Sequence, residues 1–468
     1  TLPTRTEMHE TRLMHDEGAR RVSGRARSRM PVSTVGTVNV PVLLVQYADK
    51  KFASSTVKED FEEHLNGDTY NRENGGYGSA RRYFEDQSGG LFSPQLDIIG
   101  PVTLSKDMEY YGGNDDQGND LRPQEMVQEA CRLANAEADF SRYDNNGDGY
   151  VDILYVIYAG YGEASNPSQL GNTIWPHQWQ LQSPLSLDMV KINEYACNNE
   201  LEYANEVRLA GIGTFCHEFS HCLGLPDFYD TGDKGGFGMN AWSLMDYGCY
   251  NNNGHTPCGY TGYEKDFLGW RKLVVLDNPT DVTMKPLSEG GDAYKIVNEA
   301  NPNEYYVLEN HKRTRWDSHA PAEGMLVIHV DYQEAAWQNN TTNNDPAHQR
   351  MTIIPADNTL TANTLRGDTY PGTSNNTELT DRSTPSAKVY TGGTMGQDIT
   401  NISLDEGVIS FSFMKGALSA PQNTAITDVT SSGFTLGWDM VDDATAYEVL
   451  LEYLELNPYL IDEDFAKV

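Results

Sequence analysis

The sequence predicts a mixed α/β domain followed by an all-β half, and three observations support this fold class. Two continuous apolar runs of strand length, residues 40–47 and 153–159, flank a helical pattern that opens at Pro123. After about Trp270, short β-branched and aromatic runs alternate with Asn, Gly, Pro and Asp clusters. The length of 468 residues allows about two to four domains that each bury a core.

The chain starts with a basic segment. Residues 1–30 contain seven Arg and four acidic residues, whereas the whole chain has 34 basic and 68 acidic side chains and a formal net charge of −34. We interpret residues 1–37 as an N-terminal arm or as the remnant of a propeptide, with the Arg-rich stretch at 20–29 as a candidate processing site.

Residues 38–272 are predicted to form the α/β domain. Its two apolar runs are expected to be buried strands, and Met126, Val127 and Ala130 recur at helical spacing between them. Proline is well placed in a first helical turn, so Pro123 marks where this helix begins.

Residues 273–415 are predicted to form a β-sandwich, because their apolar runs are short and separated by turn residues. The runs are at residues 305–308, 325–330, 351–354 and 408–413. Residues 416–468 contain two period-2 strands, at 434–438 and 446–450, that resemble the opening of a fibronectin type III module. Because such a module needs about 100 residues, this segment is predicted to be partial.

The charge and hydropathy exclude two classes of partner. A strongly acidic chain is a poor ligand for nucleic acid or for an anionic membrane, because neutralising phosphates requires a basic surface. The longest apolar run, residues 38–45, falls far short of the roughly 18 residues of a membrane span. We therefore expect no nucleic-acid partner and no membrane insertion, and we expect binding of hard cations to be favoured.

The six cysteines leave two alternatives open. They are too few for a disulfide scaffold, but Cys249 and Cys258 bracket a polar loop that a local bridge could close. Six buried thiols are the equally supported alternative.

The strongest chemical signal is a His-Glu-x-x-His motif formed by His217, Glu218 and His221. The surrounding apolar residues recur at three- and four-residue spacing and predict a helix with one apolar stripe: Ile212, Phe215, Phe219 and Cys222. Two imidazoles four residues apart share another face of that helix and can bind one Zn²⁺. Glu218 is then placed to hold a water and to act as the general base of a hydrolase.

A third metal ligand is expected just after this helix. Gly224 is placed to end the helix in a left-handed conformation, and Pro226 prevents its continuation. Asp227 lies ten residues after the first histidine, where the metzincin pattern has its third ligand, although that ligand is usually a histidine. Asp230 and Glu264 remain rival third ligands, ranked behind Asp227.

Two further residues are assigned to the same site. The segment 243–247 is similar to a Met-turn, which would place Met245 beneath the two imidazoles; ordinary core packing is the alternative. Tyr247, two residues later, is the candidate for stabilising the oxyanion of the tetrahedral intermediate, by analogy with metzincins that have Tyr at this offset.

A second metal signal is an EF-hand-like loop over residues 144–152. Oxygen-bearing side chains occupy its positions 1, 3, 5 and 9: Asp144, Asn146, Asp148 and Asp152. Gly149 follows the pattern at position 6, but Tyr155 stands where the pattern has a bidentate acid. We predict a structural Ca²⁺ of modest affinity, with an Asx-rich turn as the alternative.

These motifs resemble those of secreted zinc metallopeptidases of the immune inhibitor A (thuringilysin) type. The family signature His-Glu-Phe-x-His-x-Leu-Gly-Leu-Pro-Asp-x-Tyr-Asp matches residues 217–230, and further similarity covers roughly residues 38–415. The resemblance implies a metzincin-like zinc endopeptidase with a prodomain and C-terminal β modules, acting on protein or peptide substrates. It also implies export by a bacterium, with a signal peptide already removed, and a monomer is favoured.

The main alternative is a noncatalytic adhesion or carbohydrate-binding protein in which the peptidase-like domain is an accessory. An intact His217, Glu218 and His221 argue against an inactive domain. Five other histidines lack ligand spacing with one another and are expected to be surface or satisfied core residues: His177, His255, His311, His319 and His329.

Overall fold

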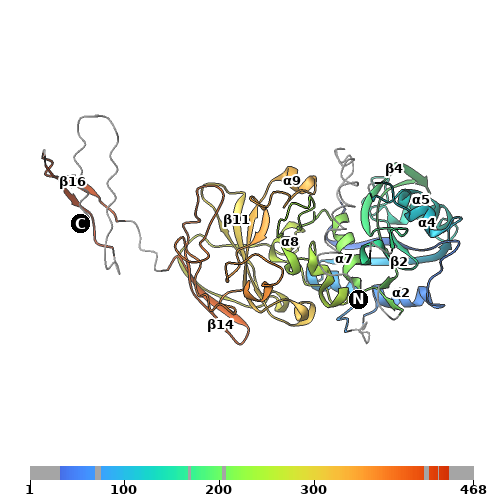
Figure 1. Cartoon of the computed structure of the whole chain (residues 1–468), viewed down its shortest axis with the longest axis horizontal. Helices are drawn as coiled ribbons and strands as arrows, with labels where there is room; N and C mark the ends of the chain where they lie inside the picture. The colour runs from blue at the N-terminus through green and yellow to red at the C-terminus, as the bar shows by residue number, and fades with distance from the viewer. Residues whose placement is uncertain are drawn as a thin grey trace.

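The computed structural model describes residues 32–68, 75–116, 118–166, 170–202, 207–415, 421–430 and 432–441. Figure 1 shows an α/β domain and a β-rich half side by side. Within the described ranges, no helix combines the length and the apolar character needed to span a bilayer.

The α/β domain is built on a five-stranded sheet with the order β2-β1-β3-β5-β4. Its strands are β1 (Gly36–Gln46), β2 (Phe92–Thr103), β3 (Tyr155–Tyr158), β4 (His177–Leu187) and β5 (Val190–Asn199). All neighbouring pairs are parallel except β4 with β5, so β4 is an antiparallel edge strand. The two predicted buried strands are confirmed as β1 and β3.

Helices cover both faces of this sheet. They are α2 (Val57–Asn66), α3 (Ala80–Ser88), α4 (Met108–Gly112), α5 (Pro123–Ala134) and α7 (Ile212–Cys222), whereas α8 (Gly262–Phe267) lies beside the β-rich half (Figure 1). Because side chains alternate along a strand, Val42 of β1 packs with Phe215 and Phe219 of α7, whereas Leu43 packs with Met126 of α5. The helix predicted to open at Pro123 is confirmed, with Pro in its first turn.

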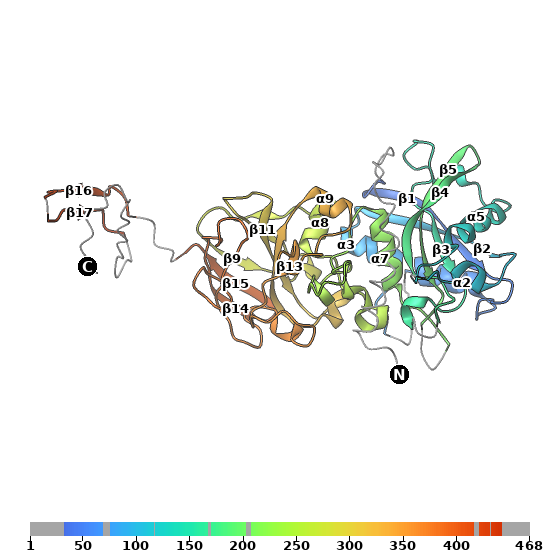
Figure 2. The ribbon, with the colours of Figure 1, turned by 45° about the horizontal axis from the view of Figure 1, so that its top comes forward.

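The β-rich half contains two sheets that share one apolar cluster (Figure 2). The five-stranded sheet has the order β13-β12-β11-β10-β8, and the three-stranded sheet has the order β14-β15-β9. The strands are β8 (Val274–Val275), β9 (Thr280–Met284), β10 (Tyr294–Val297), β11 (Glu304–His311), β12 (Gly324–Asp331), β13 (Met351–Ile353), β14 (Ile399–Asp405) and β15 (Val408–Phe413). Strands lie at all four predicted runs.

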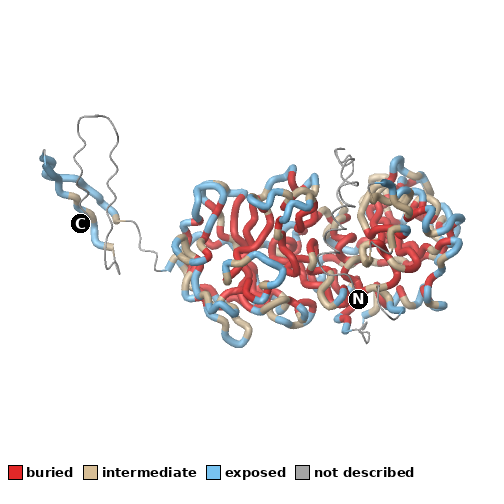
Figure 3. Tube along the Cα trace, in the orientation of Figure 1, coloured by how far each residue is buried: buried red, intermediate tan, exposed pale blue. Residues whose placement is uncertain are grey.

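The two halves are joined by a continuous core (Figure 3). Trp337, in the short helix α9 (Glu334–Gln338), packs against Phe228 and Tyr263 of the α/β domain, with ring centroids 6.2 Å apart in each pair. The loops that surround α7 are therefore contacted from the β-rich half as well as from the sheet.

Helix α7 is buried more completely than predicted. Nine of its 11 residues are buried, rather than one apolar stripe. The sheet covers one side, and the 3-10 segment Tyr247–Gly254 approaches another side so closely that a Cβ at Gly213 would lie 1.8 Å from the Cys249 carbonyl oxygen. The helix is therefore held rigidly between two layers.

The C-terminal strand prediction is partly observed. Strands β16 (Ala425–Thr427) and β17 (Thr435–Gly437) form an antiparallel hairpin, and β17 lies in the predicted run at 434–438. The second predicted strand, 446–450, and residues 1–31 of the arm lie outside the described residues. The partial fibronectin-like module stays a prediction.

All six cysteines are buried and unbridged. Of the two alternatives, the structure has the buried thiols, so Cys249 and Cys258 do not form the local bridge.

Candidate metal centre

The centre is carried by helix α7 and the turn that follows it. The helix ends at Cys222, and Gly224 then adopts a φ of 104°, in the left-handed region that favours glycine. The N–H of Leu225 donates to the carbonyl of Ser220 across this turn at 3.2 Å. The predicted reversal at Gly224 is confirmed, and it brings the following segment back beside the helix.

The two imidazoles face each other across one turn of α7. The Nε2 atoms of His217 and His221 are 3.2 Å apart. The Nδ1–H of His217 donates to the carbonyl of Leu244, and that of His221 donates to the carbonyl of Leu225, each at 2.8 Å. Because a carbonyl can only accept, these bonds fix the tautomer of each neutral ring and leave both Nε2 lone pairs directed at the same point.

Asp227 places a carboxylate oxygen, the candidate third ligand atom, at that point. Its Oδ1 lies 3.1 Å from Nε2 of His217 and 3.4 Å from Nε2 of His221. Tetrahedral zinc, with ligands at about 2.0–2.1 Å, places its ligand atoms roughly 3.3 Å from one another. The three atoms therefore have the chemistry and the spacing that a zinc ion requires.

The charges of the three groups are strongly coupled. Burial disfavours a charged Asp227, yet His221 and His217 hold the pKa of its carboxyl well below the usual range. Burial likewise opposes a charged His221, but the Asp227 carboxylate outweighs it and raises the pKa of His221 to about 9. A cation that takes this place must therefore displace a proton.

Glu218 lies at the same centre. A carboxylate oxygen of Glu218 and a ring nitrogen of each histidine lie within 4.8 Å of one another, and no other such group of three His, Cys, Asp or Glu residues occurs in the described ranges. Burial, followed by the charge of Glu218, raises the pKa of the Tyr155 phenol well above its usual value. The Glu218 side chain is thus directed into the interior beside the two imidazoles.

The two rival third ligands are engaged elsewhere. Asp230 accepts hydrogen bonds from the backbone N–H groups of three residues in its own loop: Gly232, Lys234 and Gly236. Glu264 accepts from the Ser243 hydroxyl at 2.6 Å and closes a capping box with Thr261 at the start of α8. Burial raises the pKa of Glu264 to about 7. Neither carboxylate is among the atoms that converge on the imidazoles.

The predicted Met-turn adjoins the centre. Met245 is fully buried, and its carbonyl accepts from the N–H of Phe228 at 2.8 Å, next to Asp227. The preceding carbonyl, of Leu244, is the one that holds the His217 ring. Tyr247 is partly exposed, and its ring lies 6.2 Å from that of Tyr250. The roles of Met245 and Tyr247 stay predictions.

The residues of the predicted calcium loop form hydrogen bonds within the loop. Asp144 accepts from the backbone N–H groups of Asp148 and Gly149, and Asp152 accepts from the N–H of Asn145 and the amide of Asn146. These bonds are typical of an Asx-rich turn. The oxygen-bearing side chains are gathered in one loop, and a carboxylate oxygen that accepts one N–H still has a lone pair for a cation, so the Ca²⁺ site stays a prediction.

The remaining histidines have other partners, as predicted. The contacts are His177 with Tyr195, His255 with Glu202, His311 with Glu309, His319 with Ser318 and His329 with Glu304.

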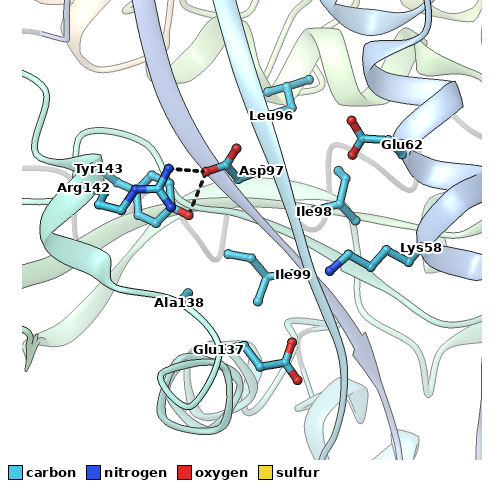
Figure 4. A pocket seen from close by; sticks show the side chains of 10 residues that line it. All are labelled: Lys58, Glu62, Leu96, Asp97, Ile98, Ile99, Glu137, Ala138, Arg142 and Tyr143. Carbon is cyan, nitrogen blue, oxygen red and sulfur yellow. Dashed lines mark hydrogen bonds and ion pairs between the residues drawn. The ribbon is translucent and has the colours of Figure 1, made fainter.

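A hollow of about 360 Å³ lies at the β2 edge of the sheet (Figure 4). In it Asp97 pairs with Arg142 and accepts from the Tyr143 hydroxyl, and Lys58 and Glu62 approach from α2. No residue of the metal centre lines it.

Sequence reasoning missed the residues of the β-rich half that contact the centre. Asn340 and Thr342 both bond to Asp227, which is 113 and 115 positions away in the chain. The only signal was an Asn-rich stretch, residues 339–344, after a short helix.

Similarity to known proteins covers the domain that carries this centre. The family description "Immune inhibitor A peptidase M6, catalytic domain" matches residues 34–272, about half of the chain. Immune inhibitor A of Bacillus thuringiensis subsp. alesti is 29% identical over 283 residues, covering 51% of this chain and 41% of that protein. Pre-pro-metalloprotease PrtV of Vibrio cholerae serotype O1 is 34% identical over 214 residues, covering 41% of this chain and 23% of that protein. The similarity therefore spans less than half of each relative.

Proposed function

Because the chain belongs to the immune inhibitor A peptidase family, M6, we propose that it is a zinc-dependent endopeptidase that hydrolyses peptide bonds of proteins or peptides. The observation that carries this proposal is the convergence of the two Nε2 atoms and Asp227 Oδ1 within 3.1–3.4 Å of one another. Three protein ligands that leave one position for solvent or substrate are typical of catalytic zinc sites, whereas structural sites use four.

In this proposal His217, His221 and Asp227 hold the zinc ion. A bound zinc ion lowers the pKa of a water ligand toward neutrality and polarises the scissile carbonyl. Glu218 is the general base: its carboxylate takes a proton from the attacking water and later gives it to the leaving amine. Its position next to His217, and its burial, support this role. Each ring donates its Nδ1–H to a backbone carbonyl, of Leu244 or of Leu225, and this hydrogen bond keeps the ring in the tautomer that can bind a metal.

Two further roles are proposed for residues that follow the helix. Met245 packs beneath the imidazoles, which its complete burial and the adjacent Leu244 bond support. Tyr247 stabilises the oxyanion of the tetrahedral intermediate, a role supported by its partial exposure two residues after Met245.

We also propose the modular arrangement and the location of the protein. Residues 273–415 form a β-sandwich module, supported by two sheets packed on one apolar cluster, and residues 416–468 form a partial fibronectin type III-like segment. Residues 1–37 form a basic arm or propeptide remnant. Export is supported by the similarity to a protein whose name, Pre-pro-metalloprotease, describes a precursor.

A second cation site is proposed in the loop 144–152. The gathering of Asp144, Asn146, Asp148 and Asp152 in a nine-residue loop with two glycines at positive φ supports a structural Ca²⁺. The loop's own N–H groups use only part of the acceptor capacity of these oxygens, so the same side chains can also bind a cation.

The test of the proposed activity is hydrolysis of casein before and after zinc removal. We expect a zinc chelator to abolish cleavage and stoichiometric zinc to restore it. Glu218→Gln, an isosteric change, is expected to lower the rate by about 10²- to 10⁴-fold while zinc content stays near one per chain, because it removes the base and no ligand. Glu59→Gln, on the exposed side of α2, is the matched control and should be fully active.

Cleavage by Glu218→Gln at the wild-type rate would overturn the base assignment. A wild-type protein that binds no zinc and cleaves nothing would overturn the proposed activity, and it would favour the noncatalytic adhesion or carbohydrate-binding alternative.

A further inference from the structure

A single side chain of the β-rich half makes a reciprocal pair of hydrogen bonds with the third proposed ligand. The Nδ2–H of Asn340 donates to Oδ2 of Asp227 at 2.7 Å, and the backbone N–H of Asp227 donates to Oδ1 of Asn340, also at 2.7 Å. The bonded carboxylate oxygen is the one that does not face the imidazoles. The contact therefore selects which oxygen of Asp227 is directed at the metal centre.

Asn340 is itself held in place. Its φ of 55° lies in the left-handed region, which Asn tolerates better than most residues. Its carbonyl accepts from the Thr231 hydroxyl at 2.6 Å, and its N–H donates to the carbonyl of Trp337 at the end of α9. Both ends of the contact are thus anchored, one in each half of the molecule.

Neighbouring residues bind the backbone rather than the carboxylate of the same loop. The Thr342 hydroxyl donates to the carbonyl of Asp227 at 2.6 Å, and the Asn343 amide donates to the carbonyl of Phe228 at 2.7 Å. Gln349 accepts from the N–H of Gly238 at 2.7 Å. Asn340 therefore contacts the carboxylate of Asp227, whereas Thr342 and Asn343, two and three positions later, contact only the backbone of its loop.

We propose that Asn340 is a positioning residue that orients the Asp227 carboxylate toward zinc, so that the metal centre is completed from the β-rich half. The proposal rests on the zinc site of the proposed function. A carboxylate ligand needs a second hydrogen-bonding partner to fix its rotation, and loss of such a partner typically lowers metal affinity by about 10- to 100-fold. Asp227 lies in a loop after the helix, and the Asn340 amide holds the carboxylate oxygen that is turned away from the imidazoles.

The test compares two substitutions in the full chain. Asn340→Gly keeps the positive φ accessible and removes only the amide, whereas Thr342→Val keeps the shape and removes only the bond to the Asp227 carbonyl. Zinc affinity is measured by competition with a chromophoric chelator, and unfolding of the zinc-free protein is measured in parallel. We expect Asn340→Gly to lower zinc affinity about 10- to 100-fold and Thr342→Val to change it less than threefold.

Replacing zinc by Co²⁺ gives a second measurement, the visible absorption spectrum, which a loss of protein stability alone would not change. The visible absorption of Co²⁺ reports its ligand geometry, so Asn340→Gly should shift this spectrum and Thr342→Val should leave it unchanged. Equal zinc affinity and equal spectra for Asn340→Gly and wild type would overturn the positioning role, as would equal losses in both variants. If the wild type binds no zinc, the proposed function fails instead.

Discussion

Two regions of this protein gather candidate metal ligands, and their side chains are arranged differently. At the centre on α7, ligand atoms of His217, His221 and Asp227 lie 3.1–3.4 Å from one another. In the loop 144–152, the carboxylates of Asp144 and Asp152 accept hydrogen bonds from that loop's own N–H groups. Both arrangements satisfy the sequence pattern of a metal site. In the first region the atoms converge on one point, whereas in the second they also complete the hydrogen bonds of a turn.

Other buried carboxylates extend the comparison. Asp230 is stabilised by three loop N–H groups and needs no cation. Asp368 is fully buried, and its Oδ2 accepts from the Trp242 indole at 2.7 Å, but its Oδ1 has no hydrogen-bond partner within the described structure. Burial raises the pKa of Asp368 to about 7. The buried carboxylates thus differ in their surroundings: Asp227 faces two imidazoles, Asp230 accepts from backbone donors, and burial favours the protonated form of Asp368.

Asp368 gives the larger of two stability effects that sharpen this comparison. Its pKa is higher in the folded protein than in the unfolded chain, so the folded state binds more protons between about pH 4 and pH 7. The contribution of this group is therefore present at low pH and lost as pH rises toward 7. We expect Asp368→Asn to remove about 2 to 4 kcal/mol of pH-dependent unfolding free energy over this range.

The measurement is denaturant unfolding at several pH values, taken as the difference between the variant and the wild type. That difference cancels the titration of other buried groups, such as Glu264, which is present in both proteins. If the difference in unfolding free energy between variant and wild type does not change with pH, then folding does not raise the pKa of Asp368.

The calcium loop gives the smaller effect. If the loop binds Ca²⁺, adding the ion at ten times its dissociation constant should stabilise the protein by about 1.4 kcal/mol, because only the folded loop binds. Thermal unfolding with calcium and with EGTA measures this shift, and Asp144→Asn should remove it. An unchanged midpoint in the wild type would leave the loop as an Asx-rich turn.

Much of the fold could be predicted because it depends on local signals. The burial of β1 and β3, the start of α5 at Pro123 and the reversal at Gly224 each follow from apolar runs or from backbone preferences of one residue. Strands β4 and β5 were missed, because polar residues interrupt their apolar pattern.

Only the site residues that lie close together in the sequence could be predicted. Residues His217, Glu218, His221 and Asp227 lie within eleven positions, so a helix and a turn bring them together. The Asn340 contact joins positions 113 apart, and only the packing of α9 against the α/β domain creates it. The choice among Asp227, Asp230 and Glu264 likewise depended on which carboxylates the fold binds elsewhere.

The most direct test of the central claim is anomalous diffraction at the zinc edge from crystals of the zinc-loaded protein. The account predicts one strong peak about 2.0–2.2 Å from Nε2 of His217, Nε2 of His221 and an oxygen of Asp227. A peak at Asp230, at Glu264 or within the loop 144–152, with none between the two imidazoles, would contradict it.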